Sequence, residues 1–363
     1  LRAFLFFCGA IILSLPAQLP AVELSAAEEP SSLELMWRFP VGGKISAVRN
    51  DPERDRIYAV AEDRYLHAFT IEGAELWKNY IDTGKVEVLR VGCDGTVYLV
   101  AEGEKVVAIN KAGGLIWLRK PFNERVSELL LLSNGGLVCI GAEGAMAAYT
   151  HSGTMLWKSS IEIKNGGVVG AAAIFDGSEG TYTAYAVSTV GTGGGMVAAF
   201  SINGVQMWQK KLEKKPRGVF PVSDGVGVRT EDELHSYTYE GRERRRLQIG
   251  RNVAFAVGPN GETAANSFFV LRTPEGFLEK YDFNGERKWR AAAGGGSCTL
   301  VSNSRSVLLL DDEGWCEIYS TEGERILSRR LSPPASDPIL GPSGLFVYGR
   351  KDWLVETYRL SEE

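Results

Sequence analysis

The chain carries few of the side chains that perform metal or acid–base chemistry. Its three histidines, His67, His151 and His235, are scattered over 363 residues. A metal site needs three or four ligands that converge on one point. His67 and His235 occupy the same position in two different units of a sequence repeat, and His151 falls in a turn of a third unit. We therefore expect no metal site and no bound cofactor, and we interpret the chain as a non-enzyme.

The cysteines follow no catalytic or metal-binding spacing either. Cys93, Cys139, Cys298 and Cys316 are never adjacent, and Cys8 lies in the apolar N-terminal segment. An exported protein permits disulfides, but nothing in the spacing requires one. Buried thiols are the favoured interpretation, and a disulfide remains the alternative.

A set of basic residues recurs at one position of the repeat, at the expected start of the innermost strand of each unit. The formal net charge of the chain is −5, so a basic cluster stands out. Solvated strand ends are one interpretation. The other is an electropositive mouth of a central channel that attracts anionic partners. The candidate ligand-binding residues are Lys44, Lys85, Arg125, Arg217 and Arg251.

Composition favours a turn-rich β protein. Hydrophobic residues make up 44% of the chain and charged residues 23%, which is typical of a folded domain. The 42 glycines show no collagen-like period and indicate many tight turns between short strands. The acidic balance argues against nucleic-acid binding, which needs a basic surface. We interpret the basic run 242–246 as the solvated edge of an outer strand.

A Gly-x-x-x-Trp repeat organises the elements. It occurs five times, and two further units keep the glycine but have Arg245 or Leu327 at the tryptophan position; Trp37 stands alone before the first unit. Successive tryptophan positions are 37 to 51 residues apart. The complete pairs are Gly73/Trp77, Gly113/Trp117, Gly153/Trp157, Gly204/Trp208 and Gly285/Trp289.

Each unit is expected to form four short antiparallel strands. A β segment such as YLHAFT precedes the glycine, and a segment such as AELWKNY follows it. Four-stranded units of about 40 residues are typical of propeller blades. The last unit lacks its fourth strand, which we predict to be supplied by residues 33–41. The sequence thus predicts an all-β, eight-bladed β-propeller over 33–363, closed by its N-terminal strand.

The recurrent tryptophans are interpreted as blade-docking residues, not ligand-binding ones. A buried tryptophan covers about 150–250 Å², and glycine permits a neighbouring backbone to approach closely. The residues given this structural role are Trp37, Trp77, Trp117, Trp157, Trp208 and Trp289.

The N-terminal segment is expected to be an export signal. Residues 3–15 are the most apolar part of an uncharged segment, and a small-residue cleavage site follows at Ser25-Ala26-Ala27. Residues 1–27 are thus predicted to be a secretory signal peptide and 28–32 a short leader. Cys8 lies inside the apolar stretch, so the segment shows no convincing lipidation site. An uncleaved anchor is the alternative, and the expected location is periplasmic or extracellular.

This repeat resembles the PQQ-like β-propeller family, in the non-catalytic, BamB-like type. The resemblance rests on the Gly-x-x-x-Trp positions and on segments such as Ala68–Gly73, and it covers about 33–363. It implies an eight-bladed ring. The catalytic branch of the family has adjacent cysteines, calcium ligands, a catalytic aspartate and long loops, and this sequence has no adjacent cysteines and little room for loops.

The sequence therefore predicts an exported, non-catalytic scaffold of the bacterial cell envelope. Its expected partner is another envelope protein or a peptide, without nucleic acid, and membrane contact is expected only through an uncleaved signal. The alternative is a propeller that binds PQQ, another quinone or a small anion and is related to quinoprotein oxidoreductases.

Overall fold

The computed structural model describes residues 32–363, apart from short gaps at 52, 82–85, 133–134, 164–165, 177–180, 190–193, 223–224, 259–267, 295, 342–343 and 362–363. The predicted signal peptide, nearly all of the predicted leader, and Lys85 lie outside the described residues. Residues 31–363 form one compact unit. The described part contains strands and turns, and no helix in it is long and apolar enough to cross a membrane.

The strands of the first half of the chain form four consecutive sheets, here called blades 1 to 4. Blade 1 contains β2 (Ile45–Asp51), β3 (Arg56–Ala61), β4 (Tyr65–Thr70) and β5 (Glu75–Tyr80); blade 2 contains β6 (Val86–Val91), β7 (Val97–Ala101), β8 (Lys105–Ile109) and β9 (Leu115–Arg119); blade 3 contains β10 (Val126–Leu131), β11 (Leu137–Gly141), β12 (Ala145–Tyr149) and β13 (Met155–Ser160); blade 4 contains β14 (Val168–Asp176), β15 (Thr181–Thr189), β16 (Gly195–Ser201) and β17 (Gln206–Leu212).

Three further sheets of consecutive strands follow, and a last sheet joins the two ends of the described chain. Blade 5 contains β18 (Pro216–Val222), β19 (Gly225–Thr230), β20 (Glu233–Thr238) and β21 (Glu243–Gln248); blade 6 contains β22 (Ala254–Gly258), β23 (Phe268–Arg272), β24 (Phe277–Asp282) and β25 (Arg287–Ala292); blade 7 contains β26 (Cys298–Ser302), β27 (Ser306–Asp311), β28 (Trp315–Ser320) and β29 (Arg325–Arg330); the last sheet contains β30 (Ile339–Leu340), β31 (Leu345–Gly349), β32 (Leu354–Leu360) and β1 (Leu33–Pro40).

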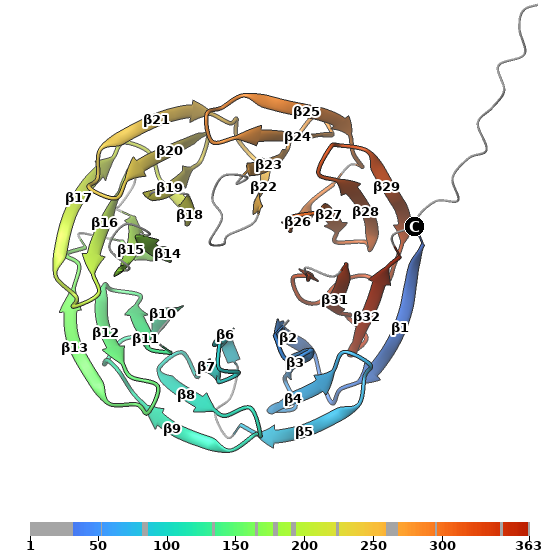
Figure 1. The fold of residues 1–363 in the computed structure, drawn as a ribbon, viewed down its shortest axis with the longest axis horizontal. Helices are drawn as coiled ribbons and strands as arrows, with labels where there is room; N and C mark the ends of the chain where they lie inside the picture. Colours follow the sequence, from blue (N-terminus) through green and yellow to red (C-terminus); the bar gives the residue numbers. More distant parts are fainter. Residues whose placement is uncertain are drawn as a thin grey trace, which may run out of the picture. The chain divides into compact units, whose positions relative to one another are not determined.

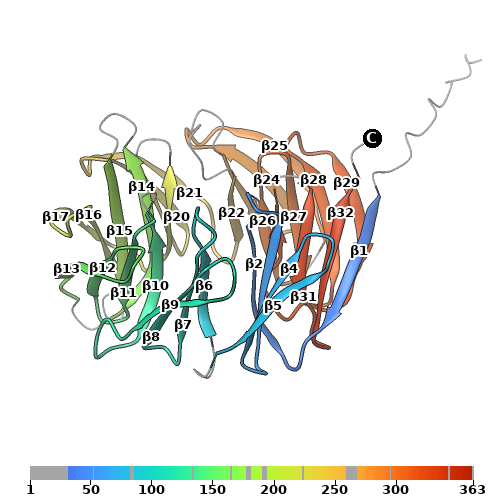
Figure 2. The same ribbon diagram turned by 60° about the horizontal axis from the view of Figure 1, so that its bottom comes forward.

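The sheets stand side by side in a ring (Figure 1). The first strand of each blade lies innermost and the fourth lies on the outside, and every pairing within a blade is antiparallel. Figure 2, a tilted view, shows the inner strands running along the ring axis. The sheets bury their faces against one another: Tyr58, Val60 and Leu66 of blade 1 pack with Leu89 and Leu99 of blade 2 in one apolar cluster.

The last sheet corrects the prediction of an eight-bladed ring of four-stranded blades. Seven blades are complete segments of four consecutive strands, whereas the sheet at the eighth position is a composite of both ends, with β1 paired to β32. Its inner strand β30 has only two residues. The sequence gives the reason: Pro333, Pro334 and Pro338 precede it, and proline lacks the amide donor that a strand ladder needs.

Each outer-strand tryptophan contacts the next blade. The indole Nε1 of Trp117 donates to the carbonyl of His151, at 2.8 Å, in the turn between the outer strands of blade 3. Gly153 in the same turn has φ +81°, and a Cβ there would come within 2.5 Å of the Trp117 ring. Thus the glycine accommodates both the left-handed turn and the indole. The equivalent donors are Trp37, Trp77, Trp157, Trp208 and Trp289, each to a carbonyl of the following blade.

Other side chains cover two junctions that lack the tryptophan. Arg245 donates to the carbonyl of Asn284, and Leu247 lies against Gly285 in the same turn of blade 6. At the closing junction, Arg329 donates to the carbonyl of Leu33 at 3.0 Å. The contact between neighbouring blades is therefore kept where the tryptophan is replaced.

We predict that Trp117→Ala lowers the free energy of unfolding by about 3–5 kcal/mol, because a buried indole and its hydrogen bond are both lost. Trp353→Ala is the control, since that indole is 52% exposed. Chemical denaturation monitored by circular dichroism measures both. Equal losses for the two variants would refute the docking role of Trp117.

Candidate functional site

Four of the five predicted rim cations fall on described residues, at the starts of inner strands. Lys44 precedes β2, Arg125 precedes β10, Arg217 is the second residue of β18, and Arg251 precedes β22; all four are exposed. Because every blade begins with its inner strand, these positions lie at the same end of the ring. Lys85 belongs to the undescribed residues.

Carboxylates reduce the positive charge of this rim on one side of the ring. Arg217 Nη2 lies 3.0 Å from Glu231 Oε1, and Arg251 Nε lies 3.8 Å from Asp232 Oδ2. The attraction that the rim exerts on an anion is therefore weaker at blades 5 and 6 than the sequence pattern alone suggests. Binding of a ligand by the rim residues remains a prediction.

The sulfur and imidazole groups are dispersed. Cys139 and Cys316 are buried free thiols, and burial raises the pKa of each to a value at which the thiol stays neutral. Within the described ranges, no three His, Cys, Asp or Glu side chains are placed to hold a metal ion. His67 and His235 lie in blades 1 and 5, on opposite sides of the ring (Figure 1).

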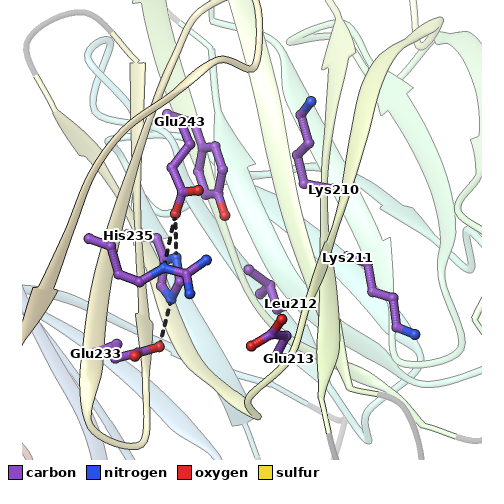
Figure 3. Close-up of a pocket in the computed structure, with 9 residues that line it drawn as sticks. Lys210, Lys211, Leu212, Glu213, Glu233, His235 and Glu243 are labelled. Carbon is purple, nitrogen blue, oxygen red and sulfur yellow. Dashed lines mark hydrogen bonds and ion pairs between the residues drawn. The ribbon is translucent and has the colours of Figure 1, made fainter.

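A pocket of about 200 Å³ opens between the outer parts of blades 4 and 5, beside His235 (Figure 3). His235 Nδ1 lies 2.9 Å from Glu243 Oε1, and its Nε2 lies 3.2 Å from Glu233 Oε2. Lys210 and Lys211 of β17 form the opposite wall. Both ring nitrogens can donate to these carboxylates at once only when the imidazole carries two protons.

The same His–Glu pair occurs in blade 1, where a phenylalanine packs beside it. His67 Nδ1 lies 2.9 Å from Glu75 Oε1, and the Phe39 ring packs against His67 at a centroid distance of 6.0 Å. Phe39 lies two residues after Trp37, and Lys210 stands at the equivalent place after Trp208. Lys210 therefore stands beside the pocket at the place where Phe39 packs against His67.

Two carboxylates at the pocket have lowered pKa values. Burial acts to raise the pKa of Glu243, but His235 and Arg246 outweigh it, so this pKa lies below its usual value. The pKa of Glu233 is likewise lowered, since Lys214, Gln248 and His235 overcome the effect of burial. The carboxylates of Glu233 and Glu243 are therefore engaged with protein cations.

The outer strands of blades 2, 3 and 4 present an unusual surface, here called the apolar belt and defined as β9, β13 and β17 with their preceding turns. Leu115 is 64% exposed and Val205 63% exposed. The other exposed large apolar side chains of the belt are Leu118, Met155, Leu156 and Met207. These strands also carry Arg119, Lys158, Lys210 and Lys211, and no acidic residue.

The outer strands of blades 5, 6 and 7 carry charges at many of the corresponding positions. Their sequences, ERRRLQ, RKWRAA and RILSRR, are rich in arginine. Charged side chains protect an exposed strand edge from pairing with other chains. The fold thus accepts arginine at these positions, so the apolar side chains of the belt are not required by the architecture.

One buried set was missed at the sequence level. In each blade, one residue of the third strand lies opposite the tryptophan position of the fourth strand. In five blades the residue just before it is ionisable, and this side chain contacts charged or polar neighbours. Glu279, for example, lies 3.2 Å from both Arg287 and Arg290. An alignment of the third strands would have identified the set, which comprises His67, His235, Glu279, Glu317 and Glu356.

Comparison with known proteins identifies the class of protein to which the fold belongs. The chain is a β-propeller, and its residues 54–224 match the family described as outer membrane protein assembly factor BamB. The resemblance to the BamB-like type is thereby confirmed for this segment. No curated protein sequence matches the chain.

Solved structures show the same fold at low sequence identity. BamB from Moraxella catarrhalis is similar with a TM-score of 0.66 and 12% identity, covering 90% of this chain and 100% of that one. Sqt1 from Saccharomyces cerevisiae gives a TM-score of 0.73 and 11% identity, over 91% and 100%. The computationally designed protein Ika8 gives 0.72 and 15%, over 90% and 100%.

The lowered pKa of Glu243 has a consequence for acid stability. A carboxyl whose pKa is lower in the folded than in the unfolded state stabilises the fold above its unfolded pKa of about 4.3, and this stabilisation is lost as the pH falls through the folded pKa. Glu243→Gln removes this contribution. We predict a smaller fall in Tm between about pH 6 and pH 3 for this variant than for the parent protein.

Glu72→Gln, at an exposed turn position of blade 1, is the control for this measurement. Its fall in Tm should equal that of the parent protein. A Glu243→Gln variant with an unchanged fall in Tm would contradict the assignment of the acid-sensitive contact to Glu243.

Proposed function

We propose that this protein is an exported, non-catalytic interaction scaffold of the bacterial cell envelope, and that it binds a partner protein through the apolar belt. The single observation that carries the proposal is the exposure of large apolar side chains on β9, β13 and β17. Contiguous exposed apolar side chains on a protein surface commonly mark a site of protein interaction.

The backbone of the belt also favours a protein partner. β9, β13 and β17 are the last strands of their sheets, so one edge of each has no neighbouring strand within its blade. Such an edge can pair with an extended segment of another chain, in which alternate side chains supply the specificity. The rim cations at the starts of the inner strands are retained as a second, electrostatic contact surface.

The chemistry of the belt specifies the class of partner. Leu115, Leu118 and Met155 offer apolar contacts, and Arg119 and Lys158 offer positive charges without an acidic residue on these strands. An extended segment that alternates apolar and acidic residues matches both features. A basic or purely polar segment does not.

Two observations support the location in the envelope. Residues 3–15 have the length and apolar composition of an export signal. The family that matches residues 54–224 is described as an outer membrane protein assembly factor. Both features are consistent with a partner that is itself an envelope protein.

We predict that Leu115→Lys with Leu118→Lys weakens partner capture by on the order of tenfold, since charges replace apolar contacts in the middle of the belt. The protein, immobilised, is exposed to a solubilised envelope extract, and the retained proteins are quantified by mass spectrometry. Both leucines are exposed, so the Tm should not change.

Ser328→Lys provides a matched control. Ser328 occupies on β29 the place that Leu118 occupies on β9, because each directly follows the tryptophan position. This variant should retain the same proteins as the parent chain. Identical retention by the double leucine variant and the parent chain would overturn the proposal.

A further inference from the structure

Arginines project from the inner strands of blades 1 and 2 at the same level. Arg49 of β2 lies opposite Tyr58 of β3, and Arg90 of β6 lies opposite Tyr98 of β7. Each guanidinium donates to the carbonyl of its preceding residue, Arg49 to Val48 and Arg90 to Leu89. The two arginines are therefore equivalent members of neighbouring repeats.

Their surroundings differ in one respect. Arg90 Nη2 lies 3.1 Å from Glu128 Oε2 on the inner strand of the next blade, and this forms an ion pair. Glu128 pairs with Ile140 in its sheet, and the residue at the equivalent place in blade 2 is Val88, which pairs with Val100. Among the described side chains, the carboxylate that neutralises Arg90 thus has no counterpart at the equivalent place beside Arg49.

Among the described residues, Arg49 has no carboxylate within ion-pair distance. Burial lowers the pKa of Arg49, and repulsion from Arg90 lowers it further, while the more distant Asp337 and Glu128 act in the opposite direction. A partly buried cation without an ion-pair partner is stabilised when an anion binds beside it.

We propose that Arg49 is a binding site for a carboxylate group, which takes beside Arg49 the place that Glu128 takes beside Arg90. The neighbouring blade shows the chemistry of the site: Glu128 occupies the corresponding position in front of Arg90. An arginine guanidinium holds a carboxylate through two parallel hydrogen bonds. The carboxylate comes either from a small organic acid or from an acidic side chain of a bound peptide.

The site is separate from the apolar belt. Arg49 and Arg90 lie on inner strands beside the ring axis, whereas the belt occupies outer strands (Figure 1). Lys44 and Arg125, exposed at the starts of inner strands, attract an approaching anion toward this region. The inference therefore does not depend on the proposed scaffold function.

The test is isothermal titration calorimetry of the full chain at constant ionic strength, with chloride replaced by one of two probes. Succinate represents a small organic acid, and an acetylated, amidated tetraglutamate peptide represents an acidic segment. The parent protein should bind at least one probe in a saturable manner. The probe that binds identifies the source of the carboxylate.

Two variants assign the binding to Arg49. Arg49→Gln removes the cation. Val88→Glu introduces in blade 2 a carboxylate equivalent to Glu128 of blade 3, which can pair with Arg49 and compete with the probe. Both should weaken binding at least tenfold, and Val88→Glu should do so while keeping Arg49. Arg359→Gln, at an exposed arginine of β32, is the control and should bind as the parent chain does.

Two results would overturn the proposal. One is the absence of saturable heat from either probe with the parent protein. The other is binding that Arg49→Gln and Val88→Glu leave unchanged, which would locate the carboxylate at another cation such as the exposed rim lysine Lys44.

Discussion

The docking of an outer-strand tryptophan against a glycine of the next blade is the contact on which the ring depends. The indole ring covers the glycine, and its Nε1 donates to a carbonyl of the same turn, as Trp117 does with Gly153 and His151. This contact fixes the distance between successive sheets. Because it joins six of the eight sheets to the next, the repeat in sequence becomes a ring in space, and the last sheet is completed by the opposite end of the chain.

The docking contact uses only part of each outer strand. The tryptophan and the residue two places after it face the next blade, where Phe39 packs on Phe69 and Arg119 donates to Gly153. The remaining side chains face outward, and the fold does not require particular residue types at their positions. Arginines occupy them in blades 5 to 7 and leucine or methionine in blades 2 and 3. The ring therefore separates residues that build the fold from residues that distinguish its surfaces.

The sequence predicted much of the fold, because glycine and tryptophan at a regular spacing report a contact that recurs at nearly every junction. It predicted the pairing of residues 33–41 with the last unit, and β1 does pair with β32. It did not predict the two-residue inner strand β30, because the repeat signal lies in the outer strands, whereas prolines before Ile339 shorten the inner one.

The candidate sites could be predicted from the sequence less well than the fold could. The pocket beside His235 depends on Lys210 of one blade standing where Phe39 stands elsewhere, which a search within single units does not reveal. Arg49 lacks an ion-pair partner among the described side chains, and blade 2 has Val88 at the place where blade 3 has Glu128. Such features arise from pairs of residues in different repeats, and only the arrangement of blades shows which residues are neighbours.

The most direct measurement of the central claim is hydrogen–deuterium exchange of the protein with and without its captured partner. We expect slower exchange of backbone amides in β9, β13 and β17 on binding, because their outer edges gain a neighbouring strand. Amides of β25 and β29 should exchange at unchanged rates. Protection confined to β25 and β29, or absent from all the outer strands, would contradict the assignment of the apolar belt as the binding surface.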